Sequence, residues 1–147
     1  MKISALDVFI TAEEVASHIQ KLLAKIPVVQ NATVECADNG IIIRGNATLG
    51  LTVPFETLWH VTARATNEVV VELARLKASV FGLGGDAMAE MLMNQLSKKL
   101  EHITGVRVEG RTIRADAVAV LKQYDVELRG VLREITVTRE GVSIKVD

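Results

Sequence analysis

The chain has 147 residues and a formal net charge of −1, with 17 Lys and Arg against 18 Asp and Glu. This balance argues against a nucleic-acid-binding protein, because phosphate binding requires clustered Lys and Arg without neutralising acids. The length predicts one domain over residues 1–147, and no stretch reaches the roughly 18 uncharged residues of a membrane span. Cys36 is the single cysteine, so an internal disulfide is excluded. With no leader-like apolar run at the start, the sequence favours the cytoplasm.

Hydrophobic residues make up 49% of the chain, whereas aromatic residues make up only 3%. The interior must therefore be filled mainly by Val, Leu, Ile and Ala. So high an aliphatic content beside 24% charged residues indicates either a large core or a cavity.

The N-terminal region predicts a strand followed by a helix. Residues Ile3–Ile10 have the pattern of a short strand. Thr11 is placed to cap a helix, and Glu14, three residues later, completes a capping box. The helix is expected to run to about Ile26, because Pro27 cannot continue it.

From residue 32 to residue 80 the apolar pattern alternates, which is typical of strands. Asp38-Asn39-Gly40 predicts a tight hairpin. Two long strands are expected at Leu58–Ala65 and Val69–Val80. In the second strand the apolar residues move from odd to even positions after Leu73, as they do at a β-bulge.

Residues Asp86–Ile103 have the most regular helical pattern, because apolar residues recur along one face at steps of three and four. Such a helix is roughly 27 Å long, whereas the twelve residues of Val69–Val80 span about 40 Å. Strands of that length must coil around the helix or overhang it. We therefore expect an α+β fold in which a long, strongly curved antiparallel sheet wraps around this long helix, with a second, N-terminal helix.

The remainder of the chain predicts short elements. Val106–Ile113 reads as a hairpin, and Asp116 is placed to cap a short helix. Strands are expected at Tyr124–Leu128, Val131–Val137 and Val142–Val146. The sequence shows no internal repeat and no linker.

The loop Phe81-Gly82-Leu83-Gly84-Gly85 before the long helix is the nearest approach to a phosphate-binding loop. It lacks the Lys-Ser/Thr that follows the last glycine of a P-loop, because Asp86 stands there. The glycines are explained more simply by a sharp turn from a strand into a helix.

The titratable residues form no pattern that indicates catalysis or metal binding. The histidines His18, His60 and His102 lie far apart and share no ligand spacing with carboxylates or with Cys36. Cys36 precedes a hairpin and is expected to pack as a small apolar residue. We therefore expect no metal, no cofactor and no enzymatic activity.

Three of the four methionines lie close together on the long helix, at positions 88, 91 and 93. They would fill an ordinary core, or they would form a flexible wall that adapts to apolar ligands. The sequence does not decide between these two interpretations.

The order of elements and several segments resemble the bacterial relatives of tubular lipid-binding (TULIP) proteins, which have the bactericidal/permeability-increasing-protein-like fold. The segments that carry the resemblance are Ile10–Val15, Val34–Arg44 and Val108–Asp116. It rests on alternation and glycines, and includes no catalytic motif. The resemblance implies a curved sheet wrapped around a long helix, with acyl chains held between them. Many relatives are secreted or tethered, whereas this chain shows no leader, which favours a cytoplasmic carrier or scaffold.

We therefore expect non-enzymatic binding of a lipid, a fatty-acid-like molecule or another long apolar ligand between the long helix and the sheet. The residues predicted to contact the ligand are Trp59, Val61, Val71, Leu73, Met88, Met91, Leu92, Met93 and Leu96. Exposed apolar strand faces would also suit a homodimer or larger assembly without a ligand. A further alternative is a hotdog-type acyl-thioester hydrolase, which needs a carboxylate and helix amides that converge on the substrate.

Overall fold

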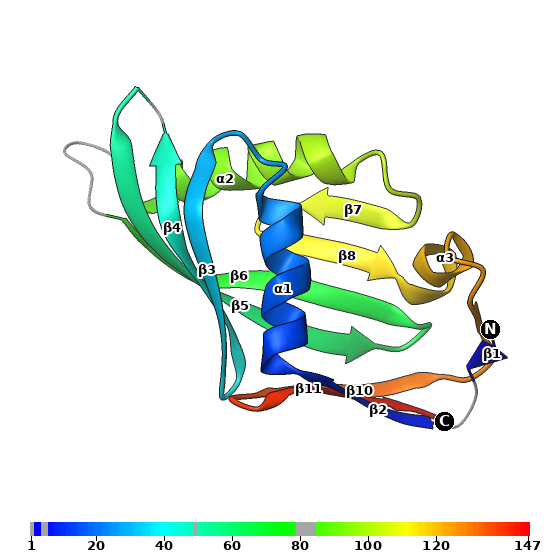
Figure 1. Ribbon diagram of the computed structural model, residues 1–147. Coiled ribbons are helices and arrows are strands. Elements are labelled where there is room, and N and C mark those ends of the chain that lie inside the picture. Colours follow the sequence, from blue (N-terminus) through cyan, green and yellow to red (C-terminus); the bar gives the residue numbers. More distant parts are fainter. Residues whose placement is uncertain (1, 4–5, 49, 79–84) are drawn as a thin grey trace.

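The computed structural model describes residues 2–3, 6–48, 50–78 and 85–147, and strands make up 54% of these residues. Two antiparallel sheets and three short helices form most of the structure (Figure 1). In chain order the elements are β1 (Lys2–Ile3), β2 (Leu6–Thr11), α1 (Ala12–Leu23), β3 (Val29–Ala37), β4 (Gly40–Thr48), β5 (Thr52–Arg64), β6 (Glu68–Ala78), α2 (Gly85–Leu100), β7 (Val106–Glu109), β8 (Thr112–Asp116), α3 (Ala117–Lys122), β9 (Glu127–Leu128), β10 (Leu132–Thr138) and β11 (Gly141–Val146).

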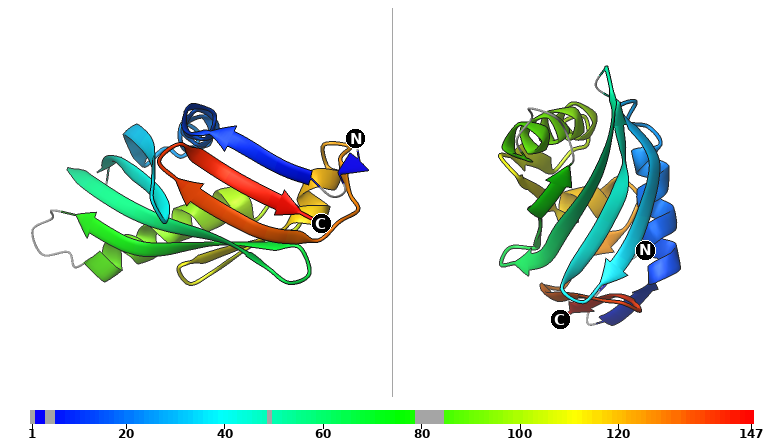
Figure 2. Two further views of the ribbon diagram at one scale, coloured as in Figure 1. Left: turned by 90° about the horizontal axis from the view of Figure 1, so that it is seen from below. Right: turned by 90° about the vertical axis from the view of Figure 1, so that its left-hand side faces the viewer.

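The larger sheet has six strands in the order β3-β4-β5-β6-β8-β7, and all of its pairs are antiparallel. The smaller sheet has three strands in the order β10-β11-β2. It lies across the lower end of the larger sheet in Figure 1, and Figure 2 shows it from below. β1 and β9 form a separate, short parallel pair.

The predicted fold, a long curved sheet wrapped around one long helix, is wrong. The structure is mostly β, and α2 has only 16 residues, from Gly85 to Leu100, instead of the predicted Asp86–Ile103. It contacts β6 and β7, whereas β5 continues past it and contacts β10 of the smaller sheet. The long central strands therefore pack against α1, α2 and the second sheet. They do not coil around a single helix.

The predicted start of the first helix is confirmed. Thr11 is the N-cap of α1, and its side-chain oxygen accepts a hydrogen bond from the backbone N–H of Glu14 at 3.2 Å. The helix ends at Leu23, three residues before the predicted end. A turn then continues the chain, because the N–H of Lys25 donates to the carbonyl of Leu22 and that of Ile26 to the carbonyl of Leu23.

The predicted hairpin and bulge are also confirmed. Asn39 has a φ of 75° in the turn between β3 and β4, a conformation that asparagine tolerates well. The pairing of β5 with β6 shifts by one residue between Leu58 and Trp59, so that Trp59 lies opposite Leu73 and Leu58 opposite Arg75. Leu73 and Leu76 therefore both reach the hydrophobic core.

The chain ends form less strand than predicted. The expected strand Ile3–Ile10 is divided into β1 and β2, and residues 4–5 lie outside the described residues. Only Glu127–Leu128 of the expected strand Tyr124–Leu128 pairs, and its partner is β1. Asp116 caps α3 as predicted, because its carboxylate accepts hydrogen bonds from the N–H groups of Val118 and Ala119 at 3.0 and 3.2 Å.

Buried apolar residues form two clusters on one face of the larger sheet. The first joins the C-terminal part of α1 and the inner side of α2 to the centre of β5 and β6. The second joins Val15 of α1 and Cys36 of β3 to Val137 and Val142 of the smaller sheet. Both helices and the smaller sheet therefore cover the same face. No helix in the described ranges is long and apolar enough to cross a membrane.

Candidate functional site

A cavity of about 310 Å³ lies between α1, α2 and the covered face of the larger sheet. Each helix contributes three residues to its wall, and these are Ile19, Leu22, Leu23, Leu92, Leu96 and Leu100. All six strands of the sheet contribute the rest, namely Val29, Ile41, Ile43, Phe55, Thr57, Trp59, Val61, Val71, Val106, Ile113 and Ala115. The cavity therefore occupies the centre of the fold.

Strand alternation explains why these side chains share one face. Successive residues of a strand point to opposite sides of the sheet, and residues paired across strands point to the same side. Ile41 pairs with Trp59, and Val61 pairs with Val71, which in turn pairs with Ile113. These pairings carry one continuous apolar surface across four neighbouring strands.

Thr57 carries the one hydroxyl group among the residues that line the cavity, and only 1% of its surface is exposed. Its hydroxyl donates to the backbone carbonyl of Ile43 at 3.0 Å and accepts a hydrogen bond from the indole N–H of Trp59 at 2.8 Å. The polar groups of both side chains are thus satisfied within the protein. The lining residues offer a ligand an apolar surface and no charged group.

The cavity meets the solvent along one flank of α1. Leu22 lines the cavity, yet 39% of its surface is exposed. On the opposite flank of the helix, the side chain of Gln20 donates to the carbonyl of Ala32 in β3 at 3.3 Å. The helix is therefore attached to the sheet on the β3 side, and the mouth lies on the side of Leu22.

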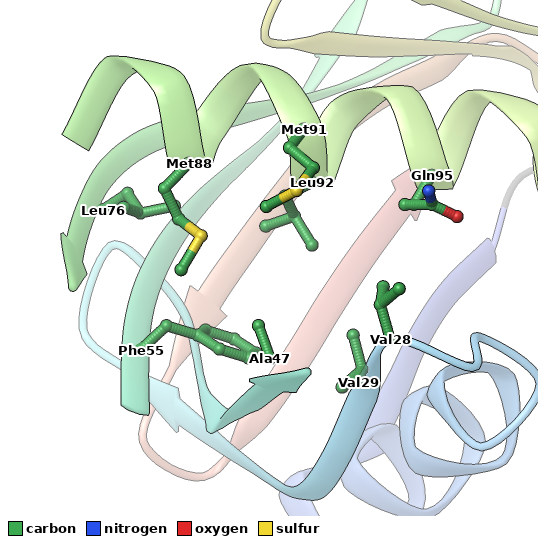
Figure 3. Close-up of a pocket in the computed structure, with 9 residues that line it drawn as sticks. All are labelled: Val28, Val29, Ala47, Phe55, Leu76, Met88, Met91, Leu92 and Gln95. Carbon is green, nitrogen blue, oxygen red and sulfur yellow. The ribbon is translucent and has the colours of Figure 1, made fainter. Parts of the chain in front are cut away.

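Two of the three helix methionines lie beside a second space that is almost filled (Figure 3). Met88 and Met91 line a void of about 10 Å³, together with Phe55, Leu76 and residues of the α1–β3 connection. A void of this size has room for about one water molecule at most. The thioether side chains thus serve as core packing here, which is the first of the two interpretations left open by the sequence.

The nine residues predicted to contact a ligand separate into three groups. Five of them line the cavity, namely Trp59, Val61, Val71, Leu92 and Leu96. Met88 and Met91 line the small void instead. Leu73 is buried in the first core cluster, and Met93 is buried on the side of α2 that faces the β7–β8 hairpin. The structure therefore brings about half of the predicted site together.

The parts of the site on α1 and on β3, β4, β7 and β8 were not predicted from the sequence. Ile19, Leu22 and Leu23 share one apolar face of the first helix, but nothing in the sequence places that face opposite α2. Ile113 and Ala115 likewise required the pairing of β8 with β6. Leu22 could have indicated the site from the sequence, because it makes the apolar face of the first helix wider than a buried face needs to be.

Residues with catalytic or metal-binding chemistry lie elsewhere. Among the described residues, no group of three or more His, Cys, Asp or Glu could hold a metal ion. Cys36 is buried in the second core cluster, and burial raises the pKa of its thiol. The glycine loop predicted at Phe81–Gly85 lies outside the described residues except for Gly85, which begins α2.

The charged residues of the central strands lie on the opposite face of the sheet. Arg44 contacts the carboxylates of Glu35 and Glu56 at 2.9 and 2.7 Å. The hydrogen bond from Arg44 lowers the pKa of Glu56. These exposed ion pairs add little to stability, but they leave one face of the sheet charged and the other apolar.

Comparison with known proteins does not assign a function to the site, so its function is inferred from its geometry. No family model, curated protein or solved structure matches the chain. The tubular lipid-binding resemblance therefore stays a prediction, and the sheet-around-helix arrangement that it implied is not the one observed. The apolar cavity is the feature that any assignment of function has to explain.

Proposed function

We propose that the protein binds an apolar molecule, or the apolar chain of an amphiphile, in the cavity between α1, α2 and the larger sheet. The observation that carries the proposal is the 310 Å³ cavity with a wholly apolar wall, apart from the internally bonded Thr57. This volume lies at the lower end of the range of about 300–1,000 Å³ for small-molecule sites. The expected ligand is therefore small, or enters with one chain only.

The cost of leaving the wall of the cavity in contact with water supports an occupant. Apolar surface exposed to water costs about 25 cal/mol per Å² relative to buried apolar surface, and this wall is apolar and open to solvent at the mouth. Water would reduce the cost poorly, because an internal water needs two to four polar partners and the side chains of this wall offer no unpaired one. An apolar ligand removes the cost without needing any polar partner.

Trp59 provides a direct measurement, because it lines the cavity and is the only tryptophan in the chain. Protein purified from cells is extracted with organic solvent and analysed by native mass spectrometry for a bound small molecule. The extracted protein is then titrated with 1-decanol while the emission of Trp59 is recorded. We expect saturable binding, and the absence of both a co-purified molecule and a saturable change contradicts the proposal.

Ala115→Phe is the matched blocking variant, because a large ring at this position would occupy the cavity. It should remove decanol binding while the far-ultraviolet circular dichroism spectrum stays unchanged. Leu51→Ala is the control, since Leu51 is an exposed apolar residue outside the cavity. This variant should bind decanol as the unmodified protein does.

Homodimer formation is the second candidate function, and the edge strand β2 favours it. This strand exposes 46% of Leu6 and 52% of Phe9, and it contains no lysine or proline of the kind that protects sheet edges. Light scattering after size exclusion tests this candidate. A dimer that Phe9→Lys converts to a monomer supports it, and a strict monomer at all concentrations contradicts it.

A further inference from the structure

The cavity and the small void share part of their walls. Val29, Phe55 and Leu92 line both spaces. Along α2, the residues that line the cavity follow one another at steps of four from Leu92 to Leu100, over about 12 Å at 1.5 Å per residue. The void takes up the position one turn before, at Met88. It therefore continues the cavity toward the N-terminus of α2, beyond the shared side chains.

Two of the shared side chains are held in place by the larger sheet. Phe55 is buried, and its ring lies over Gly45 of the neighbouring strand, where an added Cβ atom would be 3.2 Å from the end of the ring. Val29 is also buried, and as a β-branched residue it has few rotamers. Neither side chain can move aside without disturbing the packing of the sheet.

Leu92 is the shared side chain that has room to move. It is only half-buried, although it lies in the wall of both spaces. Beside it in the void are Met88 and Met91, whose side chains have three rotatable bonds and adapt to irregular gaps. Figure 3 shows the three side chains on the side of α2 that faces Phe55. A change at Leu92 can thus join the two spaces while the sheet stays as it is.

We propose that Leu92 sets the length of the apolar chain that the cavity accepts. Its side chain closes the cavity toward Met88 and Met91, and the end of a ligand chain stops against it. This assignment rests on the proposed function, to which it adds a limit on chain length and the residue that determines this limit. A shorter side chain at position 92 opens the way into the void, where the two methionines rearrange around a longer chain.

The test measures the binding of straight-chain alcohols from 1-hexanol to 1-dodecanol through the emission of Trp59, which lines the cavity. Each further carbon atom inside the apolar wall should raise the affinity about fourfold, which corresponds to about 0.8 kcal/mol per buried CH₂ group. Carbon atoms that no longer fit stay outside and add little. In the unmodified protein the affinity should therefore stop rising within the series, at a chain length that defines the limit.

Leu92→Ala should move this limit to chains about two carbons longer, so that alcohols beyond the original limit bind about tenfold more tightly than they do to the unmodified protein. Leu92→Val removes less of the side chain and should move the limit by about one carbon. This milder variant keeps the test available if Leu92→Ala does not fold. The control is Leu76→Ala, which enlarges the void but leaves Leu92 in place, and its limit should equal that of the unmodified protein.

The outcomes separate this inference from the proposed function. If the alcohols bind but both Leu92 variants keep the original limit, Leu92 does not close the cavity, and the inference is overturned while the binding of apolar ligands stands. It is also overturned if the affinity rises over the whole series, or if Leu76→Ala moves the limit as far as Leu92→Ala does. If no alcohol binds to the unmodified protein, the proposed function fails, and this inference fails with it.

Discussion

The two halves of α2 meet the sheet in different ways. Near its N-terminal half, where Met88 and Met91 project, the remaining void is about 10 Å³. Beside its C-terminal half, where Leu96 and Leu100 project, the cavity is about 310 Å³. Leu92, in the middle of the helix, lines both spaces. One helix on one sheet thus has a packed region and an open region only a few turns apart.

Side-chain flexibility and the position of α1 account for this difference. Methionine has three rotatable bonds and fills irregular gaps, so the N-terminal half of α2 closes onto Phe55 and Leu76. The open region is bordered by leucines and by β-branched residues, which have few rotamers. There α1 also lies against this face, where Leu23 at its end and Ile26 in the turn that follows are buried in the core. The methionines are therefore the clearest difference between the walls of the two spaces.

Truncation of one side chain in each region should give the largest contrast in stability. Met88 is 3% exposed and packed on all sides, so Met88→Ala should cost about 2–5 kcal/mol of unfolding free energy. Leu96→Ala should fall at or below the lower end of that range, because Leu96 lines the cavity and already faces open space. Urea denaturation of both variants measures the difference. Equal costs would contradict the contrast between the two regions.

Replacing an alanine by a larger residue should have opposite effects on stability in the two regions. Ala89 is 0% exposed, so Ala89→Leu should cost about 1–3 kcal/mol through overpacking. Ala115 borders the cavity, and Ala115→Leu should be neutral or stabilising in ligand-free protein. Thermal unfolding of protein freed of ligand by extraction measures whether each substitution lowers or raises the melting temperature. Similar destabilisation by both changes would mean that the cavity has no room for added carbon atoms.

Removal of the Thr57 hydroxyl should destabilise the cavity wall. Thr57→Val keeps the shape of the side chain but leaves the indole N–H of Trp59 without its acceptor. An unsatisfied buried donor costs about 1–3 kcal/mol. Thr57→Ser retains the hydroxyl and should cost less, and the comparison is made by urea denaturation. If Thr57→Val is the more stable of the two, the hydrogen bond is not needed at this position.

A thiol in the open region should react faster than the thiol in the packed second core cluster. The substitution that introduces it should have almost no effect on stability. Ala115→Cys places a thiol in the cavity, whereas Cys36 is buried and burial raises its pKa. Iodoacetamide at mildly alkaline pH should therefore modify the introduced thiol faster than Cys36, as followed by mass spectrometry. A bound ligand should slow only the reaction in the cavity, and equal rates at the two thiols would contradict the difference in access.

The same pKa shift predicts a small dependence of stability on pH. Because the pKa of Cys36 is raised in the folded state, the folded protein holds this proton more tightly than the unfolded chain does. The resulting stabilisation is present below the unfolded pKa and is lost as the pH rises through the folded pKa. Cys36→Ala should remove this loss from an alkaline denaturation series.

Local chemistry made several elements predictable. The Thr11 cap, the turn at Asn39 and the bulge beside Leu73 each depend on residues close together in the sequence, and all three are confirmed. The cap requires a side-chain oxygen and the turn a residue that tolerates positive φ. The bulge is visible in the sequence, because the apolar residues change from odd to even positions there. Such features are decided within a few residues of chain.

The arrangement of the elements could not be predicted in the same way. The sequence indicated that the central strands are longer than the helix, but two geometries satisfy this difference in length. The strands could coil around one helix, or further elements could cover the rest of the same face. The choice depends on contacts such as that of β5 with β10, which are distant in sequence and leave no local pattern. The cavity depends on this choice, so only the parts of its wall on β5, β6 and α2 were predicted.

One pairing in the smaller sheet has a consequence for the order of folding. β2 lies beside β11, with Leu6 opposite Val146 and Thr11 opposite Gly141. During synthesis β2 is made long before β11, which is its only partner in the described part of the sheet. Pairing between such distant segments is slow, and an unpaired strand is prone to aggregate. β2 therefore stays unpaired until β11 has been made. The smaller sheet should be the last part of the molecule to become protected from amide hydrogen exchange.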